Sequence, residues 1–210
     1  MKKYLVLLTV LYSGLCFGAD KLELVVPPEA IAKKLQATAT LLNKVYQGEP
    51  VTVLMVMKGA LCLTTDLIRK LDCPVTLEYV QANTYGEEHG AKGEVRLTGI
   101  ENLKIKGKNV LIIDDVLDSG NTMAAIIKAI KPKNPKSLKT VVLLSKREPK
   151  KDRHSSDNYA LFYMNPITRN FPDDNKRRNI VGYGIDFDEH YRELPGLYIH
   201  EETQEPIKKS

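Results

Sequence analysis

The sequence predicts an α/β protein built on an open, mostly parallel, twisted sheet with helices on its faces. Strand-length apolar runs alternate along the chain with segments of helical periodicity, a pattern typical of parallel sheets joined by crossover helices. In addition, residues 110–113 are apolar at every position, as expected for a central strand covered on both faces. In such sheets ligands bind beyond the carboxyl ends of the strands, so the residues that follow each strand are the candidate site.

Length and composition fit an ordinary globular domain. The chain has 210 residues, of which 43% are apolar and 27% charged, with no Trp and three Cys. This apolar content can fill a core, which argues against intrinsic disorder and against a small disulfide scaffold. The net charge is only +5, and Lys2 and Lys3 supply two of these charges. Charge therefore gives no reason to expect a nucleic-acid partner.

The N-terminal segment, residues 1–19, resembles a secretory signal peptide. A charged start is followed by an apolar run over residues 4–17 and by small residues at 18–19. The run falls short of the roughly 20 apolar residues that span a membrane, so the mature chain is not expected to contact one. A buried helix or a misassigned start codon are the alternatives. We expect a single domain over residues 20–200 and a frayed tail over 201–210.

The first element after this segment is a helix. Pro28 and Glu29 suit its first turn, and Gly48 and Pro50 end it. Apolar residues recur at spacings of three and four, which predicts one core-facing stripe: Ile31, Leu35, Thr38, Leu42 and Val45.

A strand, loop and helix follow. The apolar run 51–57 has the length of a strand, Lys58 and Gly59 form a loop, and residues 60–71 have the composition of a helix. Residues 75–82 form a second strand. The stretch 86–99 is polar, contains four glycines and has no period, which predicts a mobile surface loop.

The remaining elements continue the alternation. A third strand, a helix and a fourth strand are expected at 110–113, 123–130 and 139–145, and late strands at 180–187 and 197–200. The chain between residues 146 and 178 is rich in Lys, Arg, Asp, Asn and Pro and contains one apolar island at 159–164, to which we assign no element.

Residues 110–122 (VLIIDDVLDSGNT) carry the most informative chemistry. A buried strand delivers Asp114 and Asp115 to its end, and a short loop with Ser119, Gly120 and Thr122 leads into a helix. Backbone N–H groups of such a loop, together with the helix N-terminus, suit a phosphate. The carboxylates suit ribose hydroxyls or a magnesium ion. Taken alone, a pair of aspartates is usually a solvated strand end, and Ser-Gly-Asn is usually a turn. Their succession after a buried strand and before a helix predicts a site for a sugar phosphate and a metal.

This segment resembles the phosphoribosyl diphosphate (PRPP) signature of type I phosphoribosyltransferases: hydrophobic residues, two acids, two hydrophobics, then Asp-Ser-Gly-x-Thr. Further segments are similar to the hypoxanthine or hypoxanthine-guanine branch. They are 57–60 (MKGA), like its diphosphate loop, 84–86 (TYG), like its mobile loop, 144–146 (LSK), like its base-binding strand end, and 181–194, like its C-terminal block. The likeness runs from about residue 22 to residue 199. It implies the fold above with a small hood made from the N- and C-terminal segments.

The resemblance implies that a purine nitrogen displaces diphosphate from PRPP, which would give IMP from hypoxanthine and GMP from guanine. Asp114 and Asp115 would hold the ribose hydroxyls, and Asp118 would act near N7 of the purine as general base. The loop that would bind the 5-phosphate contains Asp118, Ser119, Gly120, Asn121 and Thr122. The other implied contacts are Lys58, Gly59 and Arg192 for diphosphate, Lys146 and Ile180 for the base, Thr84 and Tyr85 in the mobile loop, and Asp186 for the implied cofactor, Mg²⁺.

Two departures from the family pattern bear on the base. Asn179 stands where an aromatic residue usually stacks on the purine, with Phe171 and Tyr163 as substitute platforms, and the region between Lys146 and Asp186 is longer than usual. A transferase for another purine, such as xanthine, and a PRPP-binding regulator without turnover are therefore the alternatives. A nucleic-acid binder has only basic clusters in its favour.

Location, thiols and assembly complete the expectations. Family resemblance implies a cytoplasmic homodimer or homotetramer, whereas a functional signal segment implies export. Without that segment, Cys62 and Cys73 are the cysteines that remain, and we expect free core thiols rather than a disulfide.

Overall fold

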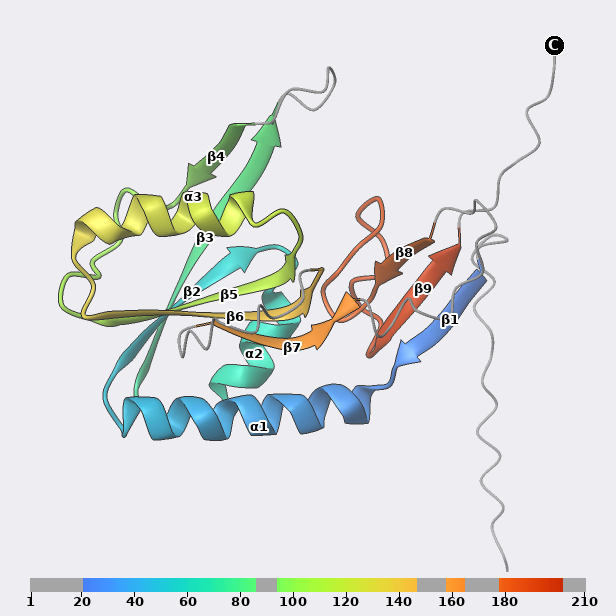
Figure 1. Cartoon of the computed structure of the whole chain (residues 1–210), viewed down its shortest axis with the longest axis horizontal. Coiled ribbons are helices and arrows are strands. Elements are labelled where there is room, and N and C mark those ends of the chain that lie inside the picture. The colour runs from blue at the N-terminus through green and yellow to red at the C-terminus, as the bar shows by residue number, and fades with distance from the viewer. Residues whose placement is uncertain (1–20, 86–93, 147–157, 165–177, 202–210) are drawn as a thin grey trace, which may run out of the picture.

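A six-stranded sheet forms the centre of the computed structural model, which describes residues 21–85, 94–146, 158–164 and 178–201. The strand order is β4-β3-β2-β5-β6-β7, and every neighbouring pair is parallel except β3 and β4. This confirms the mostly parallel sheet. The strands are β2 (Val51–Met57), β3 (Val75–Tyr85), β4 (Glu94–Thr98), β5 (Asn109–Leu117), β6 (Ser137–Ser145) and β7 (Asn158–Tyr163) (Figure 1).

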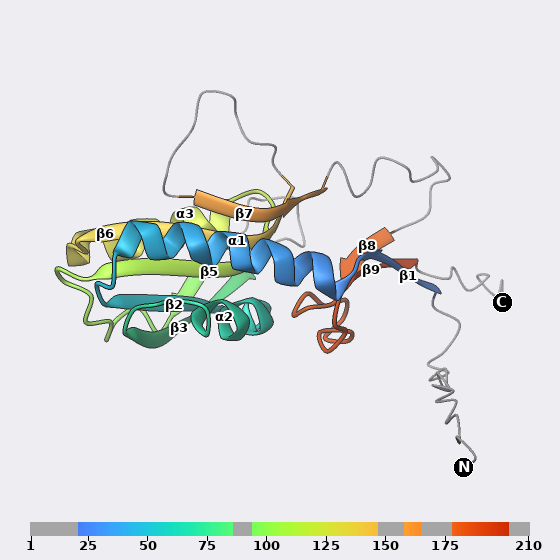
Figure 2. The same ribbon diagram turned by 90° about the horizontal axis from the view of Figure 1, so that it is seen from below.

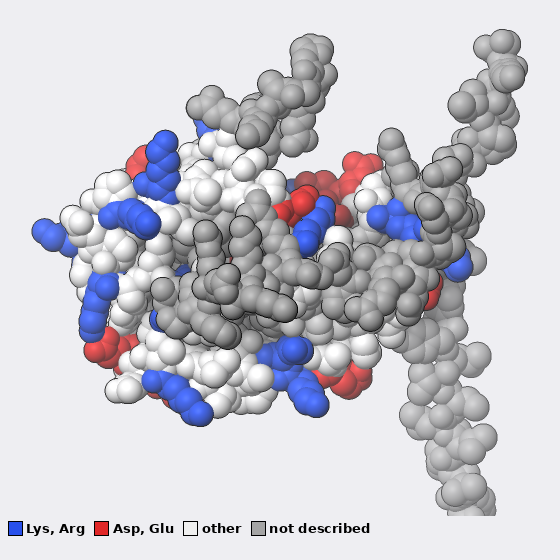
Figure 3. Space-filling model, in the orientation of Figure 1, with Lys and Arg blue, Asp and Glu red and all other residues white. Residues whose placement is uncertain are grey.

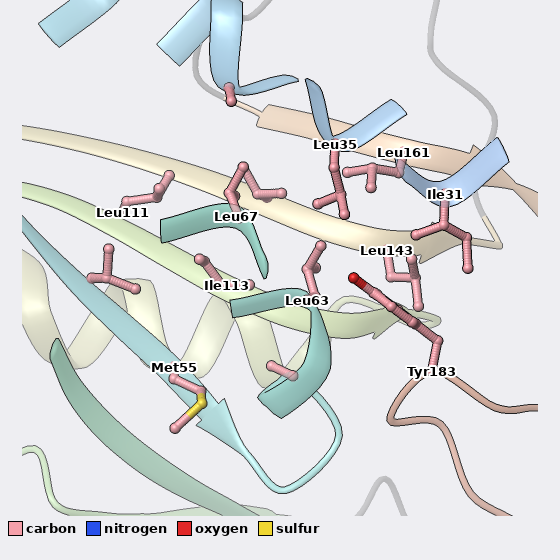
Figure 4. Close-up of a cluster of buried hydrophobic side chains, with 14 of the residues drawn as sticks. Ile31, Leu35, Met55, Leu63, Leu67, Leu111, Ile113, Leu143, Leu161 and Tyr183 are labelled. Atoms are coloured by element: carbon pink, nitrogen blue, oxygen red, sulfur yellow. The ribbon is translucent and has the colours of Figure 1, made fainter. Parts of the chain in front are cut away.

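Helices cover both faces of this sheet (Figures 1 and 2). Helices α1 (Pro28–Tyr46) and α2 (Leu61–Ile68) lie on one face, and α3 (Asn121–Ile130), followed by a short 3₁₀ turn at Lys131–Lys133, lies on the other. Each face has its own hydrophobic cluster, in which alternate side chains of β5 point to opposite sides. The cluster under α1 and α2 includes Ile31, Leu35, Leu63, Leu67, Leu111, Ile113 and Leu143 (Figure 4).

A second, smaller sheet stands beyond the carboxyl ends of the parallel strands (Figures 1 and 2). It consists of β1 (Lys21–Val26), β9 (Leu197–Glu201) and β8 (Arg178–Val181), in the order β1-β9-β8, and both pairs are antiparallel. The two ends of the chain thus build the hood that family resemblance implied. Its position leaves the strand ends of the large sheet facing it.

Several boundaries differ from the sequence prediction. Strand β3 continues to Tyr85 and pairs with β4, so residues 94–98 are not part of a loop. Helix α2 ends at Ile68, three residues before the predicted end. The apolar island after residue 158 is β7, and the predicted strand 180–187 ends at Val181.

Two single residues also correct the sequence prediction. Val45 is 43% exposed and Tyr46 takes its place in the buried stripe, because a residue four positions after Leu42 faces the core more directly. Glu201, expected to start a frayed tail, is the last residue of β9 and forms a 3.2 Å ion pair with Arg178.

Two global expectations concern membranes and thiols. Within the described ranges, no helix combines the length and apolar character needed to cross a bilayer. Cys62 and Cys73 are free, half-buried thiols. This agrees with the prediction of free thiols rather than a bridge.

Candidate active site

A pocket of about 240 Å³ opens where the strands β2, β3 and β5 end and the segment after β8 folds back toward them. Acidic and basic side chains lie side by side in the region between the large sheet and the hood (Figure 3). The pocket contains most of the charged residues that the sequence pointed to. Its lining comprises Val56, Met57, Lys58, Gly59, Ala82, Asp114, Asp115, Val116, Thr122, Asp186 and Arg192.

Two adjacent carboxylates, those of Asp114 and Asp115, lie in the second half of β5. Asp114 is 5% exposed, and its Oδ1 accepts a 3.0 Å hydrogen bond from the backbone N–H of Asp115. The Oδ1 of Asp115 accepts a 2.7 Å bond from the N–H of Val116. Because β5 extends to Leu117, both acids belong to the strand itself rather than to the loop after it.

Burial governs the protonation of this pair. Desolvation, reinforced by the neighbouring Asp115 charge, raises the pKa of Asp114 well above its usual range. Burial also raises the pKa of Asp115, although the N–H of Val116 and, more weakly, Arg192 oppose the shift. The pair thus holds a proton more readily than ordinary aspartates do, and Asp114 is the preferred position of that proton.

Replacing Asp114 by asparagine is expected to stabilise the protein increasingly as pH rises. An acid whose folded-state pKa is raised contributes stability below its unfolded pKa, about 3.9, and loses that contribution as pH climbs through the folded value. Asparagine keeps the acceptor for the N–H of Asp115 and removes the buried charge. Melting temperatures between pH 4.5 and 8 measure the effect, with the exposed Asp188→Asn as control. A difference between Asp114→Asn and wild type that shrinks toward pH 8 contradicts the assignment.

Glycines allow the loop after β2 to lie against these acids. A Cβ on Gly59 would overlap the Asp115 carboxylate. A Cβ on Gly184, whose φ is +101°, would overlap the carbonyl oxygen of Gly59. The chain is therefore layered, with Gly184 on Gly59 and Gly59 on Asp115, and each step of this packing needs a residue without a side chain. The peptide bond between Met57 and Lys58 is cis.

Two cations face the pocket from opposite segments, and carboxylates hold both. The Nη2 of Arg192 lies 2.9 Å from Asp186 Oδ1 and 3.2 Å from Glu189 Oε2, while its Nη1 donates to the Gly184 carbonyl at 2.8 Å. The Nζ of Lys58 lies 2.8 Å from the same Oε2 of Glu189. These two cations lower the pKa of Glu189. Sequence reasoning did not select Glu189, although its position between Asp186 and Arg192 was a usable signal.

A further ion pair joins the ends of β5 and β6. Lys146 Nζ lies 2.6 Å from Asp118 Oδ2, and the N–H of Lys146 donates to the carbonyl of Leu117. Both side chains are substantially exposed, and neither lines the pocket described above. The structure thus brings together Lys146, which was predicted to bind the base, and Asp118, which was predicted to act as general base.

The turn between β5 and α3 presents the start of a helix. Gly120 adopts φ +79° as the N-cap and has no side chain with which to cap α3. The Oγ of Ser119 accepts a 3.3 Å bond from the N–H of Asn121, while Thr122 lines the pocket. A helix start with a glycine cap and no acidic residue in its first turn is suited to an anion. It also begins at Asn121, two residues before the predicted start.

The segment that carries Asp186 and Arg192 is anchored at both ends. The Tyr183 hydroxyl donates a 2.7 Å hydrogen bond to Asp66 on α2, and the ring reaches the hydrophobic cluster under that helix (Figure 4). Burial and the Asp66 carboxylate raise the pKa of this tyrosine. At the other end, the His200 ring lies 4.7 Å from the ring of Phe187 and 5.2 Å from that of Tyr191, centroid to centroid. None of these anchors was predicted.

Some predicted site residues lie elsewhere or outside the described ranges. Thr84 and Tyr85 belong to the end of β3 rather than to a loop, because their backbones pair with Val95 and Glu94. Ile180 and Asn179 lie in β8, half-buried. Residues 1–20, the glycine-rich stretch 86–93, Phe171 and the tail 202–210 fall outside the described part of the chain.

The donor set fits a metal that the substrate helps to hold. Among the described residues there is no group of three or more His, Cys, Asp or Glu side chains placed to bind an ion. The pocket nevertheless contains the Asp186 carboxylate beside two cations that suit phosphate oxygens. Mg²⁺ is commonly bound in this way, through one or two carboxylates plus substrate phosphates and water.

Comparison with known proteins adds independent evidence. Residues 27–175 match the family described as the phosphoribosyl transferase domain. The chain is 34% identical to the hypoxanthine-guanine phosphoribosyltransferase of Aquifex aeolicus over 183 residues. This alignment covers 87% of this chain and 96% of the relative. The chain is 33% identical over 192 residues to the Dictyostelium discoideum enzyme of the same name, covering 89% and 98% respectively.

Solved structures give the same result. A hypoxanthine-guanine phosphoribosyltransferase from Bacillus anthracis superimposes with a TM-score of 0.69 and 31% identity, covering 84% of this chain and 96% of its own. A hypoxanthine phosphoribosyltransferase from Trypanosoma cruzi, in complex with the product IMP, gives 0.67 and 29%, with coverage of 84% and 92%.

Proposed function

This chain belongs to the phosphoribosyltransferase family, and we propose that it is the purine salvage enzyme that converts hypoxanthine, and also guanine, with PRPP into IMP or GMP and diphosphate. One observation carries the proposal. A single pocket combines the Asp114–Asp115 pair with two cations from other segments, Lys58 and Arg192. A ribose that carries a charged diphosphate needs both kinds of group within one site.

The ribose phosphate would lie along the end of β5 and the start of α3. Asp114 and Asp115 offer carboxyl oxygens to the ribose hydroxyls, and the turn from Asp118 through Asn121 to Thr122 offers backbone N–H groups and hydroxyls to the 5-phosphate. The transition state for loss of diphosphate resembles an oxocarbenium ion, so groups that hold the ribose and stabilise the leaving group carry most of the catalysis.

The diphosphate would meet Lys58, Gly59 and Arg192. A guanidinium suits this oxygen-rich group because it donates from a planar fork. Asp186, which lines the same pocket as Lys58 and Arg192, would be the protein's contact to Mg²⁺. When bound, the metal would neutralise charge on the leaving diphosphate.

The purine would lie beside the Lys146–Asp118 pair. Lys146 would donate to the 6-oxo group, which favours hypoxanthine and guanine over adenine, and Asp118 would accept a proton at N7. Ile180 would contact the base from the hood. Thr84 and Tyr85, at the end of β3, would help to cover the site and so exclude the water that competes for the same carbon.

A panel of bases tests the function directly. The protein starting at Asp20 is supplied with PRPP, saturating Mg²⁺ and either hypoxanthine, guanine, xanthine or adenine, and nucleotide formation is followed. IMP and GMP are expected. Product from xanthine alone would support the sister transferase, whereas PRPP binding without any nucleotide would support a regulator.

Asn179 provides a specificity prediction. Asn179→Phe should lower the KM for hypoxanthine by about fivefold or more, because stacking on an aromatic ring contributes about 1–3 kcal/mol per base in nucleic-acid systems. Steady-state kinetics with hypoxanthine and guanine measure it. Asn179→Leu is the matched control, since leucine is apolar but has no aromatic face. Equal effects of the two variants would contradict stacking at this position.

Assembly and location are separate proposals. Family resemblance favours a homodimer or homotetramer, and Leu77 and Tyr79, which are 45% and 58% exposed on β3, are available for self-association. Light scattering on the purified protein gives the number of subunits. For location, mass spectrometry of the native N-terminus distinguishes a cytoplasmic chain that retains residues 1–19 from an exported one that begins near Asp20.

A further inference from the structure

Lys58 and Arg192, the cations proposed to bind diphosphate, both contact the carboxylate of Glu189. Oε2 of Glu189 lies 2.8 Å from Lys58 Nζ and 3.2 Å from Arg192 Nη2. The Lys58 contact joins side chains 131 residues apart in the sequence, so it forms only when the segment after β8 has folded over the loop after β2. The Glu189 oxygen thus makes the same two contacts that a phosphate oxygen would make.

The Glu189 side chain differs from the other acid at this site. Asp186 is held on both oxygens, by Arg192 at 2.9 Å and by the backbone N–H of Glu189 at 2.9 Å. The side chain of Glu189 is 63% exposed, and among the described residues its carboxylate contacts only the two cations. It can therefore turn into solvent by releasing these two side-chain contacts, whereas Asp186 is also held by a backbone N–H.

We infer that Glu189 is an internal competitor for the diphosphate subsite and sets its affinity for PRPP and for the product diphosphate. The inference rests on the proposed function, because it takes Lys58 and Arg192 as the diphosphate-binding cations. An arriving diphosphate must displace the Glu189 carboxylate from both cations. On the return path the carboxylate takes the place of the departing diphosphate, so the cations are not left unpaired when product leaves.

Glu189→Gln should therefore bind inorganic diphosphate more tightly than wild type, by threefold to tenfold. The estimate follows from two exposed ion pairs, each of which typically changes an equilibrium constant by up to about fivefold. Isothermal titration calorimetry with inorganic diphosphate measures the change, both with EDTA and with saturating Mg²⁺. If diphosphate release limits turnover, kcat of this variant falls while the KM for PRPP also falls.

A neighbouring acid provides the matched control. Asp188 is exposed on the same turn and, like Glu189, has positive φ, 51° against 64°, but it forms no ion pair within the part of the chain that the structure describes. Asp188→Asn removes the same charge one residue away and should change diphosphate affinity less than twofold. An equal gain in diphosphate affinity in the two variants would overturn the inference. The gain would then come from removing any negative charge from this turn.

A double variant tests the mechanism and separates it from the proposed function. In a Lys58→Met background, Glu189→Gln should give a smaller gain, because one of the two contested cations is absent. Unchanged or weaker diphosphate binding by Glu189→Gln, in a protein whose melting temperature matches wild type, overturns the inference. If Glu189→Gln bound diphosphate more weakly than wild type only when Mg²⁺ is present, the inference would also be overturned. Glu189 would then contact the bound metal and diphosphate rather than compete with them. Failure of wild type to bind diphosphate or to form IMP would instead overturn the proposed function.

Discussion

Asp118→Asn is expected to reduce kcat for IMP formation by about 10²–10⁴-fold, the range typical for loss of a general acid or base, while PRPP still binds. The carboxylate is the proton acceptor proposed for N7 of the purine, and asparagine has nearly the same shape without that capacity. The side chain is 64% exposed at the end of β5, so the substitution leaves no buried cavity. Single-turnover kinetics and PRPP titration on the same preparation separate chemistry from binding.

A second variant removes the main ambiguity in this result. Asp118→Asn also breaks the 2.6 Å pair with Lys146. Lys146→Gln breaks the same pair from the other side but leaves the acceptor in place, so it should raise the KM for hypoxanthine more than it lowers kcat. Equal losses of kcat in both variants would show that the pair, and not proton acceptance by Asp118, is what turnover requires. Unchanged kcat in Asp118→Asn would exclude its role as general base.

The sequence predicted the centre of the fold because its signals there are local and strong. Residues 53–57 and 110–113 are apolar without interruption, and such runs have few alternatives to central strands. The two acids lie in β5, and the glycine and hydroxyls of residues 119–122 follow that strand directly, so chain connectivity alone brings them close together. The edges were harder to predict. In β4, Val95 and Leu97 alternate with polar residues over only five positions, and flanking glycines obscured the period.

The parts of the site that escaped prediction depend on contacts between distant segments. Glu189 meets Lys58 across 131 positions, and Tyr183 meets Asp66 across 117. Sequence order placed each residue near a strand end but could not show that Lys58 and Arg192 are paired with carboxylates of the chain itself. For the same reason, adjacent Asp114 and Asp115 read as ordinary anions, although burial raises the pKa of both.

Gly184→Ala should lower both the stability of the fold and the activity toward PRPP, each by a large amount. Alanine would have to adopt φ +101° and to place its Cβ against the Gly59 carbonyl oxygen, a backbone atom that cannot rotate away. Backbone strain and overpacking together are expected to cost roughly 2–5 kcal/mol, or about 5–15 °C in melting temperature for a chain of this size. Moving Gly59 also moves Lys58 and the loop proposed to bind diphosphate, so kcat/KM for PRPP should fall about 10²-fold.

Gly48→Ala separates the two causes, because Gly48 has a comparable φ of +80° but nothing within 4 Å of the added Cβ. It should cost only about 1 kcal/mol, from backbone conformation alone, and leave PRPP kinetics unchanged. The comparison is made well below both melting temperatures, where each variant is folded. If Gly184→Ala were no more destabilising than Gly48→Ala, the close layering of Gly184 on Gly59 would be wrong. If it were destabilised but kept wild-type kinetics for PRPP, the layering would support the fold without positioning the diphosphate loop.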